Sequence, residues 1–242
     1  MKAAWYEKTG EAQTVLQIGE LDNPVPNKGE VLVQLKTSGI NPSDVKTRAG
    51  ARGELQFPKI IPHSDGAGTI VDVGEGVDKN RIGERVWIWN GAFGRAFGTC
   101  AELISLPEFQ AAKINDSVDL KSAACMGIPA STAYYGIFAN GSVKDKTVLI
   151  SGGAGAVGFY GIQLAKLSGA NVISTISSDE KGEVAQEAGA DKVINYKNED
   201  VVEEIMNYTD NKGVDRIFEV EFGGNLSINE KILKSNGVIA AY

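Results

Sequence analysis

The stretch Thr147-Val148-Leu149-Ile150-Ser151-Gly152-Gly153-Ala154-Gly155-Ala156-Val157-Gly158 decides the fold of the second half of the chain. Its first five residues form a short apolar run of the kind found in buried strands. Three glycines follow in the spacing GxGxxG, and a helical pattern then extends to Leu167. Strand, glycine turn and helix in this order predict a dinucleotide site, in which backbone N–H groups at a helix N-terminus bind a pyrophosphate. A glycine-rich helix start without a ligand is the open alternative.

Strands and helices alternate on both sides of this turn. Besides residues 147–151, strands are expected at 171–176, 192–195, 214–220 and 237–242, and helices at 154–167, 179–188, 200–208 and 225–233. This alternation predicts an α/β fold with a doubly wound parallel sheet. A helical segment over 119–139 precedes it, with a bend or break expected at Pro129.

The first half of the chain follows a different pattern. Short runs of β-branched and aromatic residues, bounded by Gly, Asn and Pro, predict strands at 31–36, 68–73, 85–89 and 100–105. Several such strands at short spacing indicate a small barrel or sandwich. We therefore expect two domains, a β-rich one over 1–121 and a dinucleotide-binding one over 122–242.

Composition narrows the function classes. The 242 residues carry a net charge of -7, whereas a nucleic-acid-binding protein usually shows a basic surface. Two cysteines are too few for a disulfide scaffold and suit a reducing compartment. The sequence shows no signal peptide and no apolar run long enough to span a membrane, so a cytoplasmic location is expected.

The residues after the second strand of this half bear on the choice of dinucleotide. NAD-binding proteins usually end that strand with an acid that holds the ribose diol. Here Ser177 and Ser178 follow the strand, and the first acid, Asp179, already belongs to the next helix. Hydroxyls together with Lys181 suit an additional phosphate and favour NADPH. In the alternative interpretation, Ser178 only caps the helix and Lys181 is solvated.

Four segments resemble one family in collinear order over essentially the whole chain. They are NPSD at 41–44, GIPASTAY at 127–134, the glycine turn at 151–158, and AGAD with VINY at 188–196. Together they resemble the zeta-crystallin-like quinone oxidoreductases of the medium-chain dehydrogenase/reductase superfamily. The resemblance implies a GroES-like N-terminal catalytic domain and a Rossmann domain, with the active site in the cleft between them.

The resemblance also implies which residues contact NADPH. The pyrophosphate is expected at Ala154, Gly155, Ala156 and Val157, and the 2′-phosphate at Ser177 and Lys181. Tyr196 is expected at the adenosine end, and Thr132 and Asn225 at the nicotinamide ribose. Asn41 and Asp44 are expected near the nicotinamide itself.

The zinc-dependent members of the superfamily provide a contrast. On their pattern, Asn41, Ser64 and Ile128 stand at the positions of the catalytic metal ligands, and none of the three suits zinc. No metal is therefore expected. His63, the only histidine, stands one position away, and we interpret it as a hydrogen-bonded loop residue.

Without a Lewis acid, reduction of an electron-poor acceptor is easier than activation of an alcohol. A quinone-like small molecule is the expected acceptor, with Asn41, Lys46 and Tyr134 as candidate donors to its oxygen. The family carries a tyrosine where this chain has Lys46, so a solvated surface lysine is the alternative there. The aromatic residues Trp87, Trp89, Phe93 and Phe97 predict either a pocket wall or ordinary core.

Two further functions stay open. One is an NADPH-dependent enone or enoyl reductase of the same superfamily, and the other is a non-catalytic, crystallin-like NADPH-binding protein. The resemblance also implies another strand and a returning segment beyond Tyr242, so the chain is expected to be truncated at its C-terminus. The full-length form is expected to be a homodimer.

Overall fold

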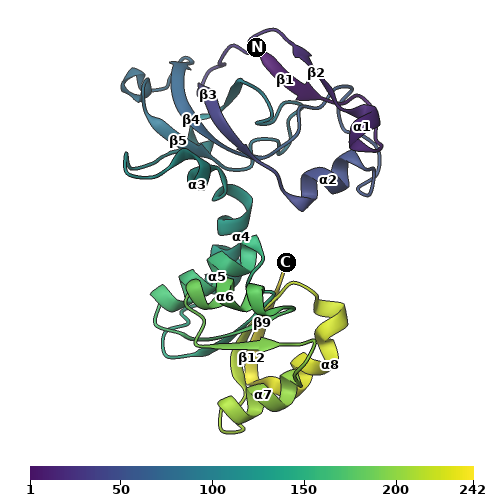
Figure 1. The fold of residues 1–242 in the computed structure, drawn as a ribbon. Coiled ribbons are helices and arrows are strands. Elements are labelled where there is room, and N and C mark those ends of the chain that lie inside the picture. Colours follow the sequence, from purple (N-terminus) through teal and green to yellow (C-terminus); the bar gives the residue numbers. More distant parts are fainter. The chain divides into compact units, whose positions relative to one another are not determined.

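The computed structural model describes all residues 1–242, which form two compact units, Met1–Ile128 (unit 1) and Pro129–Tyr242 (unit 2) (Figure 1). The sequence alone placed the boundary seven residues earlier, after residue 121. None of the helices is long and apolar enough to span a lipid bilayer.

Unit 2 is built on a five-stranded sheet in which every neighbouring pair is parallel. Its order is β10-β9-β8-β11-β12. The strands are β8 (Thr147–Ser151), β9 (Asn171–Ile176), β10 (Lys192–Asn195), β11 (Val214–Glu219) and β12 (Leu233–Ala241). The predicted α/β doubly wound fold is confirmed. Because the winding direction reverses between β8 and β11, the carboxyl ends of these two strands form the topological switch point, where such sheets bind ligands.

Helices cover both faces of this sheet (Figure 1). Val148 and Ile150 of β8 pack with residues of α4 (Gly127–Phe138), α5 (Ala156–Leu167) and α6 (Asp179–Glu187). Leu149 points to the opposite face, where α7 (Val201–Tyr208) and α8 (Phe222–Ile232) complete a second core. This alternation along one strand explains why its sequence is apolar throughout.

Unit 1 is β-rich, as predicted. Its five-stranded antiparallel sheet has the order β6-β3-β4-β5-β7, and β1 pairs separately with β2. Val31, Val33 and Leu35 alternate along β3 and fill the core of this unit. The strands are β1 (Lys2–Trp5), β2 (Gln17–Glu20), β3 (Glu30–Gly39), β4 (Asp65–Val73), β5 (Arg85–Ile88), β6 (Leu103–Pro107) and β7 (Ala111–Lys113). Short helices are α1 (Ala12–Val15), α2 (Pro42–Arg48), α3 (Leu120–Ala124), η1 (Lys79–Arg81) and η2 (Glu108–Gln110).

The helical segment over 119–139 is interrupted, but the prediction of a break at Pro129 was wrong. The break lies between α3 and α4, before Gly127. Pro129 is in the first turn of α4, where a proline costs little because that N–H has no intrahelical partner. Gly127 packs directly on Asp65, since a Cβ there would lie 2.1 Å from the Asp65 Oδ1.

Candidate functional site

The glycine turn of unit 2 is shaped by close packing at its first and third glycines. A Cβ on Gly153 would lie 2.0 Å from the Ser174 Oγ, and one on Gly158 would lie 2.4 Å from the Gly152 carbonyl oxygen. Only glycine therefore allows α5 to approach β8 and β9 this closely.

The middle glycine has a different environment. A Cβ on Gly155 would meet only the Gly152 carbonyl oxygen, at 3.3 Å. Gly155 is the N-cap of α5 and provides no side-chain cap, so the first N–H groups of this twelve-residue helix have no side-chain acceptor. Open space beside uncapped N–H groups is what an anionic pyrophosphate requires. The predicted residues Ala154, Gly155, Ala156 and Val157 surround this opening, and they fit a dinucleotide.

Two residues predicted to meet the 2′-phosphate are already in contact. The Lys181 Nζ lies 2.9 Å from the Ser177 Oγ, just beyond the end of β9. Ser178 is the N-cap of α6 and accepts a long hydrogen bond of 3.5 Å from the Lys181 backbone N–H. That contact is all that a helix cap needs, so the alternative interpretation of Ser178 agrees with its geometry. Asp179, the first acid in the sequence after β9, accepts a hydrogen bond of 3.4 Å from the Asn195 side chain.

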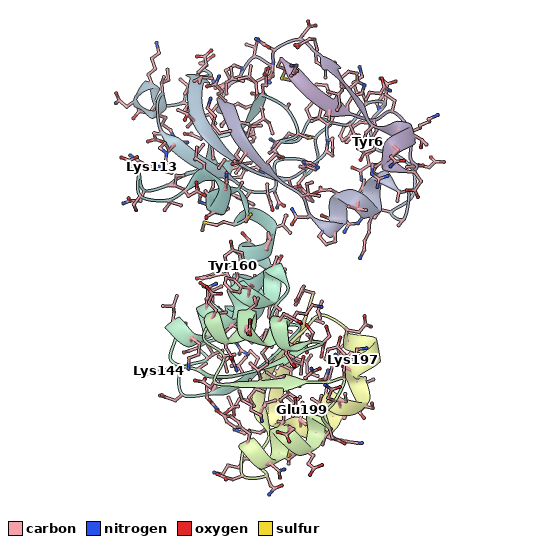
Figure 2. The ribbon with its side chains drawn as sticks, viewed as in Figure 1. Tyr6, Lys113, Lys144, Tyr160, Lys197 and Glu199 are labelled. Carbon is pink, nitrogen blue, oxygen red and sulfur yellow. The ribbon has the colours of Figure 1, made fainter.

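A second cation lies near this end of the sheet, and the sequence reasoning missed it. The Tyr196 N–H donates to the Ile176 carbonyl, which holds the loop after β10 beside the end of β9. The Lys197 Nζ lies 5.4 Å from the centre of the half-exposed Tyr196 ring, and Figure 2 shows Lys197 in unit 2. A lysine directly after a predicted cofactor-binding tyrosine was the available signal.

The carboxyl end of β11 carries a fully buried acid that the sequence reasoning also missed. The Glu219 Oε1 accepts from the Asn225 Nδ2 at 3.0 Å, and its Oε2 accepts from the Asn229 Nδ2 at 2.8 Å. Burial, followed by the charge of Glu219, raises the pKa of Tyr242 to about 12. Glu219 thus fixes Asn225, a predicted ribose contact, at the switch point.

Two predicted residues come from α4. Thr132 is half-buried, and Tyr134 is 61% exposed and packs edge-on against Phe138 at 5.0 Å. Both belong to unit 2, whereas Asn41, Asp44 and Lys46 belong to unit 1.

In unit 1, Asn41 and Asp44 are brought together at the start of α2. The Asp44 Oδ2 accepts from the Asn41 backbone N–H at 2.7 Å. The Asn41 side chain is buried and donates from Nδ2 to the Asp65 Oδ2 at 2.8 Å. The other Asp65 oxygen accepts from the Ile128 N–H at 2.8 Å. Burial raises the pKa of Asp44, while Asn41, His63 and Arg52 oppose that rise.

Asp65 is 1% exposed, and burial raises the pKa of its carboxyl from 3.8 to about 6, against the hydrogen bonds from Asn41 and Ile128. Between these two pH values the folded protein keeps a proton that the unfolded chain has lost, so stability falls as the pH rises. A pKa rise of about two units corresponds to a loss of about 3 kcal/mol in the free energy of unfolding across this pH range.

We expect Asp65→Asn, which resembles the protonated acid, to flatten the pH dependence of unfolding between pH 3.8 and about 6. Chemical denaturation followed by tryptophan fluorescence measures this, because Trp5, Trp87 and Trp89 all lie in unit 1. Parallel stability curves for the two proteins across this window would contradict the assignment.

A cavity of about 570 Å³ lies wholly within unit 1, and of the four aromatic residues offered as a pocket wall it includes Phe93 alone. Its wall combines apolar side chains with ionisable ones, including Tyr6, Asp44, Arg52, His63, Phe93 and Arg95. Its volume lies in the usual range for small-molecule sites. Phe93 does line this wall, whereas Lys46 is exposed and does not. Figure 2 labels Tyr6, which is almost fully buried.

The residues at the metal-ligand positions do not fit a zinc ion. Asn41 uses its amide on Asp65, and Ile128 offers only an alkyl side chain. No group of three or more His, Cys, Asp or Glu side chains is arranged to hold a metal in the chain. No step of the chemistry is therefore assigned to a metal.

Two family models match this chain. The model described as the alcohol dehydrogenase GroES-like domain matches residues 27–148, and the one described as zinc-binding dehydrogenase matches residues 156–242. The chain is 27% identical to a human quinone oxidoreductase over 238 residues, which cover 98% of this chain and 71% of that protein. It spans 64–72% of the lengths of five mammalian quinone oxidoreductases.

Solved structures show the same similarity. The Escherichia coli quinone oxidoreductase complexed with NADPH matches with a TM-score of 0.84 and 27% identity, covering 99% of this chain and 72% of that one. A structure titled NAD-dependent alcohol dehydrogenase matches with a TM-score of 0.90 and 28% identity, covering 100% and 77%. These similarities support binding of a nicotinamide cofactor.

Proposed function

This chain belongs to the alcohol dehydrogenase GroES-like family of the medium-chain dehydrogenase/reductase superfamily of oxidoreductases, and on that premise we propose that it transfers hydride from NADPH to a quinone or a similar electron-poor acceptor. The opening beside Gly155 is the observation that carries the proposal. It combines free helix N–H groups, space for a ligand and a place at the switch point of the sheet.

The contact between Ser177 and Lys181 supports NADPH over NADH. An ammonium group held against a hydroxyl at the end of β9 suits a 2′-phosphate, and Lys197 adds a second positive charge on the neighbouring loop. Asp179, the first acid after β9, accepts a hydrogen bond from Asn195 and does not take the place of the ribose-binding acid of NAD-dependent proteins.

We assign the acceptor to the cavity of unit 1. Tyr6 lines it, and its hydroxyl has no hydrogen-bond partner in the chain. Burial, together with the charge of Asp44, raises the pKa of this phenol, so it stays an O–H donor at neutral pH. Such a donor can stabilise the oxyanion that develops when the acceptor receives a hydride.

These contacts assign separate roles to the cofactor and to the residues that hold it. NADPH, when bound, supplies the hydride. Gly155 and the N-terminus of α5 hold the pyrophosphate, and Glu219 fixes the Asn225 amide so that its Oδ1 is available to a ribose hydroxyl. The expected homodimer and cytoplasmic location stay predictions.

An acceptor panel tests the proposal. Purified protein is mixed with NADPH and, in turn, with a benzoquinone, an α,β-unsaturated ketone and an enoyl thioester, and oxidation of NADPH is followed by absorbance. Faster turnover of the quinone supports a quinone reductase. Turnover of the enone or thioester alone favours the enone or enoyl reductase, and tight NADPH binding without any turnover favours a non-catalytic protein.

We expect Lys181→Ala to weaken NADPH about tenfold and to leave NADH unchanged, because one charge-assisted hydrogen bond contributes roughly 1.5–3 kcal/mol before solvent screening. Fluorescence titration with both dinucleotides measures this. Lys212→Ala, which removes a lysine paired only with exposed Asp210, is the matched control. Equal loss of NADPH and NADH affinity would contradict the assignment of the 2′-phosphate.

A further inference from the structure

His63 has an unusual place in unit 1. It lines the cavity that we assign to the acceptor, and its backbone φ of 78° lies in the left-handed region. Residues other than glycine are uncommon there. The Thr99 N–H donates to the His63 carbonyl at 2.9 Å, and Asp44 accepts from the His63 backbone. The backbone of His63 is therefore fixed at the cavity wall.

A chain of three hydrogen bonds determines the tautomer of His63. The Thr99 hydroxyl donates to the Asp65 carbonyl at 2.6 Å, because a carbonyl can only accept. The Thr99 Oγ1 has no second proton, so the Ser38 hydroxyl donates to it at 2.8 Å. The Ser38 proton is then also used, and the His63 Nδ1, 3.0 Å away, must be the donor to Ser38.

The neutral ring consequently carries its proton on Nδ1 and a lone pair on Nε2. The Nε2 has no partner within the chain, and it is not a buried unpaired atom. It is the ring atom left for a molecule in the cavity. A ring fixed by one nitrogen, with the other free, is the arrangement of an acid–base histidine.

We propose that His63 is the acid–base residue of the unit 1 cavity, with Nε2 exchanging the proton of the acceptor oxygen. In reduction, the acceptor receives the hydride of NADPH, and Nε2–H of protonated His63 transfers its proton to the resulting oxyanion. NADP⁺, the reduced acceptor and neutral His63 are the products, and solvent returns the proton. The second ring proton stays on the His63 Nδ1 throughout and keeps donating to the Ser38 hydroxyl oxygen.

The surroundings set the pKa of His63, and its role as an acid in reduction sets the direction of the pH dependence. Burial lowers the pKa of His63, and the carboxylate of Asp44 opposes that effect. The other ionisable groups of the cavity wall are Tyr6, Arg52, Glu54 and Arg95. Reduction is therefore expected to slow as the pH rises through the pKa of His63, and the reverse reaction is expected to accelerate.

His63 is the only histidine, so its NMR signals need no assignment in an untagged protein labelled with ¹⁵N. Two-bond ¹H–¹⁵N correlations are expected to show the Nδ1–H tautomer at neutral pH and to give its pKa directly. Ser38→Ala should abolish this preference, because it removes the acceptor of Nδ1–H. An Nε2–H tautomer in the unaltered protein would overturn the proposal without any measurement of activity.

The kinetic part rests on the proposed function. With a benzoquinone, kcat/KM should fall tenfold per pH unit above the NMR-derived pKa. In His63→Asn, kcat/KM should be about 100-fold lower and independent of pH in this range. Asparagine is chosen because it tolerates left-handed backbone, and His63→Gln serves as a second variant. Both should bind NADPH with unchanged affinity. A pH limb that survives in either folded variant overturns the role of His63, whereas an unaltered protein that binds NADPH but reduces no acceptor overturns the proposed function and the acid–base role together.

Discussion

Arg216→Met is expected to lower the free energy of unfolding of unit 2 by about 3 kcal/mol. The Arg216 guanidinium is 1% exposed and donates to the carbonyls of Ile137, Asn140 and Gly141 at the C-terminal end of α4. These carbonyls have no helical N–H to accept. Methionine keeps the apolar part of the side chain but leaves the carbonyls without donors.

The measurement is denaturation followed by two signals. Far-UV circular dichroism reports both units, whereas all three tryptophans lie in unit 1. We expect an earlier dichroism transition and an unchanged fluorescence transition. Arg85→Met is the matched control, because Arg85 also donates to three backbone carbonyls but its side chain is 27% exposed. Its expected cost is about 1 kcal/mol, and equal costs for the two variants would contradict the argument from burial.

Gly155→Ala is expected to weaken NADPH binding by roughly 10- to 100-fold while leaving stability unchanged. The φ of -75° at Gly155 suits alanine, and the added methyl would meet only one protein atom, at 3.3 Å. The fold accepts the methyl once the Gly152 carbonyl oxygen moves slightly. It occupies the space through which a pyrophosphate approaches the first N–H groups of α5.

A matched variant separates this effect from a general effect of alanine. Gly223 is the second residue of α8 and has no atom within 4 Å of an added Cβ, so Gly223→Ala should change neither stability nor NADPH affinity appreciably. Unchanged NADPH affinity in Gly155→Ala, measured by fluorescence titration, would mean that the opening is not the pyrophosphate site. Gly158→Ala should instead destabilise unit 2, because its Cβ meets backbone at 2.4 Å.

Unit 2 could be predicted from the sequence because local pattern and tertiary structure agree there. Its strands are buried on both faces and read as continuous apolar runs, such as 147–151, and the glycine turn marks the ligand edge of the sheet. Ser177 and Lys181 were expected at one place after β9, and the structure brings their side chains into contact there. The one misplaced break, at Pro129, arose because a proline is tolerated in a first helical turn.

The features that the sequence did not predict depend on contacts between distant segments. The cavity of unit 1 combines residues from Tyr6 to Ile128, and no local sequence pattern indicates such a set. The chain from His63 through Ser38 and Thr99 joins positions up to 61 residues apart. Glu219 gave a weak signal, a charged residue at the end of a buried strand, but its two amide partners are visible only in the folded chain.

The central claim, that this chain binds NADPH through unit 2, is tested most directly by fluorescence titration of the purified 242-residue protein with NADPH and with NADH. We predict saturable binding of NADPH, with NADH binding at least tenfold more weakly because it lacks the phosphate that Lys181 is placed to meet. Absence of binding for both dinucleotides, or a preference for NADH, would contradict the account.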